Sequence, residues 1–313
     1  MSVLVTGAAG FIGSSLADAL TRRGDDVIGL DCFTDYYGRD IKEANIAPLR
    51  ARSNFRFVEE TIQAVPLDAL LEGVTHIYHL AAQAGVRKSW GRDFLTYTTH
   101  NVDATQRLLE AVKTRPLTRF VYASSSSVYG DGVPIPMRED AMVQPLSPYG
   151  VTKLAAEHLC LLYTANYNVP TVSLRFFTVY GPKQRPDMGF HRFIRAAITG
   201  TPITLYGDGE QTRDFTFVDD IVAALVAAGD RGRAGAVYNI GGGSRVSINQ
   251  VLAQIEQIAG RPLDIRREPA QKGDMRDTFA DTSLARTEIG FVPRTSLADG
   301  LRAEYGWLKS LGL

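Results

Sequence analysis

Short apolar runs alternate with helix-like segments along most of the chain, and this alternation constrains the fold more than any other feature. The runs lie at residues 2–6, 26–30, 55–59, 76–81, 119–124, 171–177 and 236–241. Strands that alternate with helices in this way form a parallel sheet that is covered by helices on both faces. The sequence therefore predicts an α/β fold built on a doubly wound parallel sheet.

Glycines follow the first apolar run at the spacing of a phosphate-binding turn. The segment TGAAGFIG places Gly7, Gly10 and Gly13 between a strand and a helix. Glycine lets the backbone approach a pyrophosphate closely, and the helix N-terminus presents unpaired N–H groups to the anion. Asp31 ends the second run, near the roughly twenty-residue offset of a ribose-binding acid. A carboxylate there would repel a 2′-phosphate, so the pattern favours NAD over NADP.

The chain changes in character after Gly181, where Pro, Gly and Arg become more frequent and the apolar runs become shorter. We therefore expect residues 1–180 to form a Rossmann-type NAD-binding domain. Residues 181–313 are expected to form mainly a smaller C-terminal domain that binds the substrate. The segments FTFVDDIVAALVAA and AVYNIG read as a helix and a strand, so residues 215–241 are expected to return to the first domain.

Composition and charge exclude several classes of partner. The 313 residues include 34 Lys and Arg and 34 Asp and Glu, so the net charge is zero and neither nucleic acid nor an anionic membrane is expected as partner. No apolar run approaches the length of a membrane span. Cys32 and Cys160 lie far apart without metal-ligand spacing, so we expect free thiols, no metal, and a reducing cytoplasmic location.

Tyr149 and Lys153 are candidates for acid–base chemistry. They lie four residues apart, on one face of a helix that Ser147 and Pro148 are suited to begin. A phenol has a pKa of about 10, too high for a base at neutral pH, but an adjacent ammonium group and the positive ring of NAD⁺ favour the phenolate. The pair could then take a hydroxyl proton while hydride leaves the same carbon. In isolation, a surface pair without a role is the commoner explanation of this spacing.

Small and polar residues follow several of the predicted strands, and this clustering supports a catalytic role for the pair. Residues 124–127 are four serines after the fifth run, and Gly7, Asp31, Ala81-Ala82 and Thr178 follow other runs. Ligands bind at the carboxyl edge of an open parallel sheet. We therefore predict one site at this edge. The run before Thr178 reads as a core strand, and residues 175–177 are expected only to pack.

The chain resembles the extended short-chain dehydrogenase/reductases that act on nucleotide sugars. The matching segments are TGAAGFIG, LD at 30–31, HLAAQAGVR, SSSSVYG, the Tyr149–Lys153 pair, RFFTVYGP and YGDGEQTRDF, and they cover nearly the whole chain. The resemblance implies that Tyr149 is the base, that Lys153 tunes it and binds the nicotinamide ribose, and that Ser125 contacts the reacting oxygen. The NAD-binding residues that it implies are Gly7, Gly10, Phe11, Ile12, Gly13, Asp31, Leu80, Ala81, Ala82, Tyr149 and Lys153.

The resemblance also implies a UDP-sugar site. Arg213 and Arg276 resemble the diphosphate-binding arginines of the family, and a diphosphate calls for two or more cationic donors. Without the motifs, each would read as a solvated surface arginine. The segment PITLYG and residues 189–190 resemble the uridine pocket. The substrate-binding residues implied are Arg87, Ser125, Ser126, Thr178, Arg185, Gly189, Phe190, Tyr206, Arg213 and Arg276.

Within this family the chain is most similar to UDP-glucuronate 4-epimerases. The similarity lies in AAQAGVR, in DCFTDYY after the second strand and in RFFTVYGP-x-x-RPDM. UDP-glucose 4-epimerases usually carry asparagine where this chain has Thr178. The chain departs from the family pattern after the third strand, where Thr61 takes the place of an acid that holds adenine. Lys88 and Trp90 are also atypical.

The resemblance predicts NAD-dependent C4 epimerisation of UDP-glucuronate to UDP-galacturonate, with tightly bound NAD and a transient 4-keto sugar. A 4-keto uronate is a β-keto acid that can lose CO₂, so the site must hold the carboxylate in place. Ser126 and Thr178 are the expected hydroxyl donors. Arg185 is either a third contact to the carboxylate or a contact to the nucleotide.

Three alternatives remain open from the sequence. Two are enzymes of the same family, a UDP-glucose 4-epimerase and a UDP-glucuronate decarboxylase. The third is a catalytically silent regulator that binds a dinucleotide, and the presence of Tyr149, Lys153 and Ser125 counts against it. Family analogy further implies a homodimer that pairs through the helices near 93–113 and 149–166.

Overall fold

A seven-stranded parallel sheet forms the centre of the protein. The computed structural model describes residues 1–269 and 275–312. The strand order is β10-β6-β5-β4-β1-β2-β3, so the winding direction reverses between β1 and β4. The strands are β1 (Ser2–Thr6), β2 (Asp26–Asp31), β3 (Phe55–Glu59), β4 (His76–His79), β5 (Arg119–Ser125), β6 (Thr171–Phe176) and β10 (Ala236–Ile240). The predicted α/β fold with a doubly wound parallel sheet is confirmed.

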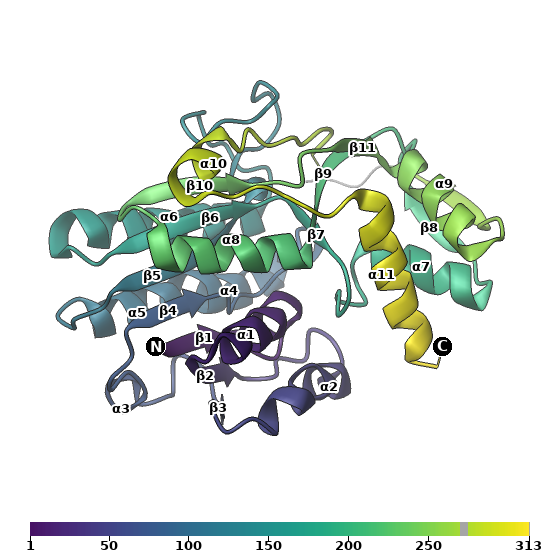
Figure 1. The fold of residues 1–313 in the computed structure, drawn as a ribbon. Coiled ribbons are helices and arrows are strands. Elements are labelled where there is room, and N and C mark those ends of the chain that lie inside the picture. Colours follow the sequence, from purple (N-terminus) through teal and green to yellow (C-terminus); the bar gives the residue numbers. More distant parts are fainter. Residues whose placement is uncertain (270–274, 313) are drawn as a thin grey trace.

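Helices cover both faces of this sheet (Figure 1). One face carries α1 (Phe11–Arg23), α2 (Arg39–Arg50) and α8 (Val218–Arg231). The other carries the short α3 (Leu67–Leu70), then α4 (Phe94–Tyr97), a π-helical segment (Thr98–Asp103), α5 (Ala104–Val112) and α6 (Pro148–Tyr167). Both faces of the strands are therefore apolar: Val3 and Val5 of β1 pack with the first group of helices, and Leu4 packs with the second.

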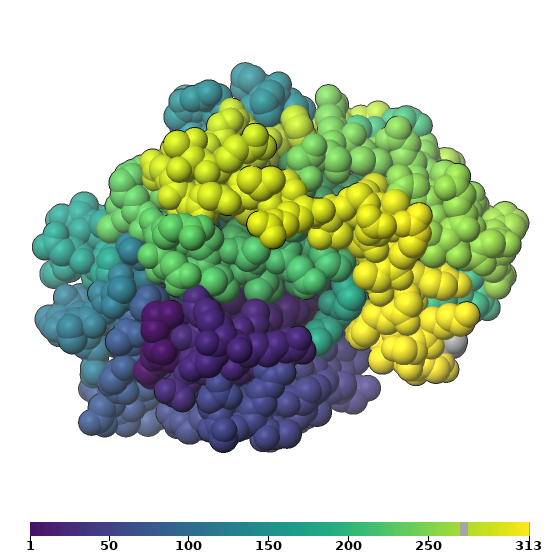
Figure 2. Space-filling model, in the orientation of Figure 1, coloured from purple at the N-terminus to yellow at the C-terminus, as the bar shows by residue number. Residues whose placement is uncertain are grey.

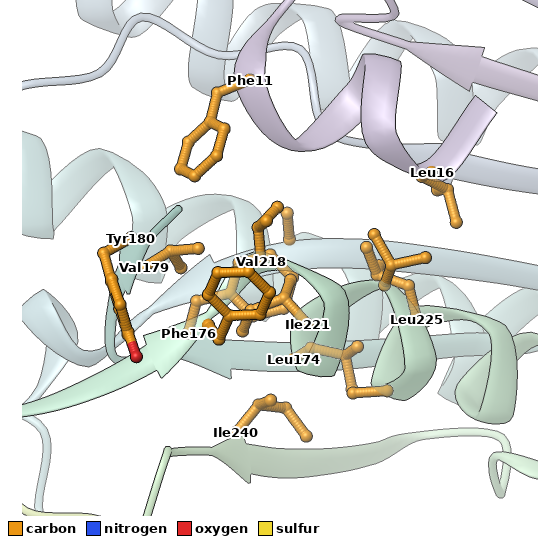
Figure 3. Close-up of a cluster of buried hydrophobic side chains, with 14 of the residues drawn as sticks. Phe11, Leu16, Leu174, Phe176, Val179, Tyr180, Val218, Ile221, Leu225 and Ile240 are labelled. Carbon is orange, nitrogen blue, oxygen red and sulfur yellow. The ribbon is translucent and has the colours of Figure 1, made fainter. Parts of the chain in front are cut away.

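The core between α1, α8 and the sheet is continuous (Figure 3). Phe11 and Leu16 of α1 approach Ile221 and Leu225 of α8, above Leu174 of β6. These side chains are at most 5% exposed. Because α8 and β10 lie in the second half of the chain, this core joins segments that are far apart in the sequence.

A smaller group of elements lies beside the main sheet. Three strands form one small sheet, β7 (Thr178–Tyr180), β9 (Thr212–Phe217) and β11 (Arg245–Ser247). Two more, β8 (Ile203–Tyr206) and β12 (Ile265–Glu268), pair in parallel. The helices are α7 (Gly189–Thr199), α9 (Ile248–Ala259), α10 (Ser283–Ile289) and α11 (Leu297–Ser310). The C-terminal segment, yellow in Figure 2, runs from α10 over the green segments to α11.

The prediction that residues 175–177 only pack is wrong for Arg175. The guanidinium is buried and donates two hydrogen bonds to the carboxylate of Glu157 in α6, at 2.7 and 3.1 Å. A cation inside a core requires such a partner. The sequence did not reveal the pair because the two residues lie eighteen positions apart on different elements. Phe177 does pack, in a small cluster with Val128 and Tyr129.

The turn between β1 and α1 leaves no room for a side chain at Gly13. A Cβ atom on Gly13 would lie 2.0 Å from the carbonyl oxygen of Gly7, far inside van der Waals contact with backbone. We expect Gly13→Ala to displace the start of α1 and to lower the free energy of unfolding by about 1–3 kcal/mol. Chemical denaturation monitored by circular dichroism measures this change.

Gly306 provides the matched control, since it also lies inside a helix, α11, but a Cβ atom there would meet nothing within 4 Å. Gly306→Ala should raise the free energy of unfolding by about 0.5–1 kcal/mol, because alanine loses less backbone entropy in a helix. Effects of the same sign in both variants would contradict this account of the turn.

Candidate active site

A cavity of about 220 Å³ opens along the carboxyl edge of the main sheet. Its walls come from the β1–α1 turn, the ends of β2, β4 and β5, and the first turns of α6. Every residue predicted to bind the cofactor lines it, namely Gly7, Gly10, Phe11, Ile12, Gly13, Asp31, Leu80, Ala81, Ala82, Tyr149 and Lys153. The structure thus gathers into one wall residues that are separated by up to 146 positions, from Gly7 to Lys153.

The cavity has the features that a dinucleotide requires. Gly7 has a φ of +71°, and a Cβ atom on it would lie 2.8 Å from the backbone nitrogen of Ala81, so only glycine leaves the end of β4 this close to the turn. Asp31 accepts hydrogen bonds from the backbone nitrogens of Ala9 at 3.1 Å and Phe33 at 2.9 Å. These bonds fix its carboxylate at the cavity wall, and each of its oxygens can accept a further bond from a ribose hydroxyl.

A further wall, which the sequence did not predict, comes from the segment between β2 and α2. Cys32, Thr34, Tyr36 and Tyr37 line the cavity there. Lys42 of α2 fixes this segment by donating to the backbone oxygen of Thr34 at 2.7 Å. In the sequence, the two adjacent tyrosines of DCFTDYY are the signal for an aromatic wall.

An acid next to Thr61 also reaches the cavity wall after the third strand. Thr61 lines the cavity as expected, but Glu60 lines it as well. The Glu60 carboxylate accepts a hydrogen bond from the backbone nitrogen of Thr61 at 2.8 Å. A carboxylate therefore stands on this wall one position earlier than the family pattern suggests.

Tyr149 and Lys153 both face the cavity from the start of α6. Ser147 caps this helix by accepting a hydrogen bond from the backbone nitrogen of Gly150 at 3.1 Å, as its sequence predicts. Burial raises the pKa of Tyr149, while a hydrogen bond with Ser125 and the positive charge of Arg185 act to lower it. Burial lowers the pKa of Lys153 to about 7. The ammonium group lies 4.4 Å from the centre of the Tyr122 ring.

A second cavity, of about 180 Å³, lies on the other side of the serine run. Ser124 lines the first cavity, whereas Ser126 and Ser127 line the second. The second cavity is also lined by Val86, Leu146, Ser147, Thr178, Arg213, Met275 and Thr278. Ser125, the hydrogen-bond partner of Tyr149, stands between the two groups of serines in the chain. Tyr149 therefore lines the first cavity and is bonded to the serine next to Ser126, which lines the second.

Arg185 and Thr178 do not line the same cavity. Arg185 lines the first, with Tyr149, and forms a two-bond ion pair with Asp187 at 2.9 and 3.0 Å. Tyr36 donates a hydrogen bond to the same carboxylate at 3.2 Å. Thr178 lines the second cavity with Ser126. The arginine thus shares a cavity with the predicted base, whereas the predicted hydroxyl donors line the other one.

Of the other predicted substrate residues, Arg213 lines the second cavity, and the structure does not place the rest on its wall. The Arg87 guanidinium stacks 4.5 Å from the centre of the Tyr206 ring. Arg276 forms an ion pair with Asp208 at 2.9 Å, and its backbone oxygen accepts a hydrogen bond from Arg213 at 3.1 Å. Gly189 begins α7, and the Phe190 side chain is 3% exposed and packs on Tyr180 and Phe215. Only the backbone of these two residues could meet a ligand.

Metal binding has no support in the described part of the chain, where no group of three or more His, Cys, Asp or Glu side chains is suited to hold an ion. Both cysteines are free thiols. The helices among residues 1–269 and 275–312 are all too short or too polar to cross a bilayer.

Comparison with known proteins agrees with this geometry. The fold is similar to the crystal structure of UDP-glucuronic acid 4-epimerase from Bacillus cereus in complex with UDP-glucuronic acid and NAD, with a TM-score of 0.97. The two sequences are 46% identical, and the match covers 99% of this chain and 100% of that chain. "Uncharacterized UDP-glucose epimerase YtcB" of Bacillus subtilis (strain 168) is 45% identical over 99% of both chains. UDP-glucuronate 4-epimerase of Thermodesulfobacterium geofontis (strain OPF15) is 37% identical, over 98% of this chain and 95% of that protein.

The family assignment follows from residues 3–241, which match the NAD dependent epimerase/dehydratase family. The match spans the main sheet from β1 to the end of β10 and includes the whole wall of the first cavity. The resemblance noted in the sequence is thereby confirmed. The chain belongs to the NAD dependent epimerase/dehydratase family.

Proposed function

We propose that the protein is an NAD-dependent UDP-glucuronate 4-epimerase, which interconverts UDP-glucuronate and UDP-galacturonate. The observation that carries this proposal is the position of Tyr149, which faces the dinucleotide cavity and is bonded to Ser125 beside the second, serine-lined cavity. A sugar in the second cavity would bring its C4 hydroxyl to the tyrosine. The relative from Bacillus cereus, solved with UDP-glucuronic acid and NAD, supports the choice of substrate.

The chain supplies the proton transfer, the orientation and the anchoring. NAD, when bound in the first cavity, supplies the hydride acceptor and donor at the sugar C4. Tyr149 takes the proton of the 4-hydroxyl as the C4–H bond breaks, which leaves a 4-keto sugar. After the sugar has turned, Tyr149 returns the proton to the oxygen as hydride adds to the opposite face of C4. The reaction is therefore redox-neutral, and atoms and charge balance.

The electrostatics of the first cavity suit a phenol that must give and take a proton. Burial alone would keep Tyr149 protonated, and the positive charge of Arg185 opposes this. Lys153 lies one turn along the same helix and adds a second positive charge when protonated. Ser125 donates to or accepts from the phenol oxygen and aligns it. These groups together lower the cost of forming the phenolate.

The nucleotide must stay in place while the sugar turns. We assign its diphosphate to Arg213 and Arg276 and its uridine to the region of Gly189, Phe190 and Tyr206. Arg276 is held by Asp208, so binding of the diphosphate would exchange one anionic partner for another. Arg87, stacked on Tyr206, would support the same region.

The carboxylate of the keto intermediate must be kept out of the geometry in which it is lost as CO₂. Loss requires the C5–C6 bond to align with the π system of the C4 ketone. Ser126 and Thr178, both in the second cavity, can hold the carboxylate by charge-assisted hydrogen bonds. Arg185, in the first cavity beside Tyr149, would reach the sugar from the cofactor side.

A UDP-glucose 4-epimerase is the second candidate, and the name of the relative from Bacillus subtilis favours it. The purified protein should be given UDP-glucuronate and UDP-glucose separately, and the products identified by NMR. We expect UDP-galacturonate from the first and slower or no turnover of the second. UDP-galactose formed at the higher rate would favour the alternative, and a UDP-pentose as main product would favour a decarboxylase.

Tyr149→Phe removes the group that moves the proton and leaves the ring. We expect kcat for UDP-glucuronate to fall about 10²–10⁴-fold, the usual contribution of a positioned acid–base group. The amount of NAD that copurifies should stay within twofold of the unaltered protein, as measured by absorbance after denaturation. Turnover at the unaltered rate would exclude Tyr149 as the base.

Thr178→Ala and Arg185→Met test how the carboxylate is held. We expect each to release CO₂ and a UDP-4-keto-pentose from UDP-glucuronate, because the keto intermediate then reaches the aligned geometry more often. The ratio of UDP-galacturonate to pentose product, measured by chromatography over time, is the readout. If both variants keep the rate and product ratio of the unaltered protein, these two residues do not restrain the carboxylate.

We also propose that the protein acts as a homodimer in the cytoplasm. Leu162 of α6 is 54% exposed and Leu95 of α4 is 73% exposed, and Val151 lies on the same α6 face three turns before Leu162. Apolar side chains on adjacent helices suit a helix-to-helix contact with a second copy. The two free thiols agree with a reducing compartment.

Leu162→Glu combined with Leu95→Glu should convert the dimer to a monomer, because two carboxylates would be buried without partners. Light scattering coupled to size-exclusion chromatography measures the mass. Val292 is 50% exposed but lies on neither helix, so Val292→Glu should leave the dimer intact. A mass unaffected by the double substitution would place any interface elsewhere.

A further inference from the structure

Glu157 and Arg175 form a buried ion pair close to the candidate site. The two residues are 1% and 5% exposed. Arg175 donates to both carboxylate oxygens of Glu157, and its remaining nitrogen donates to the Tyr129 hydroxyl at 2.8 Å. Charges so far from water are costly unless every partner is in place. Nothing in the proposed reaction uses this pair directly.

The Glu157 carboxylate contacts the two elements that carry the catalytic groups. It belongs to α6, one turn beyond Lys153 and two turns beyond Tyr149. The same carboxylate accepts a hydrogen bond of 2.6 Å from the hydroxyl of Ser124, which lines the first cavity. Ser124 directly precedes Ser125 in β5. The Glu157 carboxylate therefore links α6, which carries Tyr149, to the end of β5, which carries Ser125.

We propose that the Glu157–Arg175 ion pair is a positioning element of the catalytic centre: it fixes the end of β5 against α6, and it keeps a negative charge one helical turn from Lys153. Arg175 fixes the Glu157 carboxylate in place inside the core through two hydrogen bonds. Glu157 then orients Ser124 and stabilises the protonated form of Lys153. This role rests on the proposed epimerase function, because it concerns the groups that move the proton.

The surroundings of Lys153 explain why one carboxylate matters. Burial lowers its pKa to about 7, and the nearby Glu157 carboxylate acts to raise it. The other groups that face it are Tyr149 on the same helix, Tyr122 from β5 and His79 from β4. Burial raises the pKa of Cys160 and of Tyr122 and lowers that of His79 to about 3, so these three are uncharged at neutral pH. Of the groups named here, in the described part of the chain, Glu157 alone supplies a negative charge.

Glu157→Gln tests the proposal, since the amide keeps the shape of the side chain and removes its charge. Loss of a nearby negative charge disfavours the ammonium form, so the pKa of Lys153 should fall by about 1 unit. We would measure it by ¹³C NMR titration of NAD-bound protein labelled at the lysine ε-carbons, with the signal assigned by its absence in Lys153→Met. The alkaline limb of the kcat profile for UDP-glucuronate should move to lower pH by a similar amount.

Two variants separate positioning from mere support of the fold. Glu157→Asp keeps the charge, so the titration and the alkaline limb should return toward those of the unaltered protein. Tyr129→Phe removes the bond from Arg175 and the bond of 2.7 Å that Tyr129 donates to Asn239, but leaves the Glu157 charge. It should lower Tm by several degrees without moving either the Lys153 titration or the alkaline limb.

An unchanged Lys153 titration and an unchanged alkaline limb in folded Glu157→Gln would overturn the proposal. If that variant does not fold, Ser124→Ala takes its place, because it removes one bond to the carboxylate and no charge. We then expect a lower kcat with an unchanged KM, and an unchanged kcat would overturn the proposal. If the unaltered protein does not epimerise UDP-glucuronate, the proposed function fails, whereas the NMR titration still tests the effect of Glu157 on Lys153.

Discussion

The candidate site depends on parallel strands that all end at one edge of a sheet whose winding reverses between β1 and β4. The reversal separates the helices that follow neighbouring strands and leaves a crevice at that edge. The glycine turn after β1, the acid after β2 and the serines after β5 reach this crevice although they are distant in sequence. Backbone hydrogen bonds between strands thus hold the dinucleotide wall and Tyr149 at the same edge.

The parts of the site that the sequence predicted are those encoded locally. A glycine turn between a strand and a helix, a capped helix that begins at Tyr149, and polar residues after apolar runs each need only neighbouring residues to be recognised. All of the predicted cofactor residues line one cavity, because these local motifs all lie at the same edge of the sheet. The overall fold was likewise predictable, because alternating strands and helices admit few arrangements.

Contacts between distant elements could not be predicted in the same way. Arg175 was expected only to pack, and its partner Glu157 lies on another element. The tyrosine wall and the position of Glu60 depend on how the segments after β2 and β3 fold over the edge of the sheet. Arg185 and Thr178 line different cavities although they are close in the chain, because the rest of β7 and the turn after it lie between them.

The ion pair between Asp208 and Arg276 bears on how the enzyme releases its product. Substrate and product of an epimerase share the same nucleotide and differ at one carbon, so strong binding of the nucleotide would slow both entry and exit. If Arg276 binds the diphosphate as proposed, Asp208 would compete with the diphosphate and weaken its net binding. Departure of the product would then be assisted, since the arginine would regain an anionic partner as the diphosphate leaves. The pair would keep exchange of nucleotide sugars rapid while the cofactor stays in place.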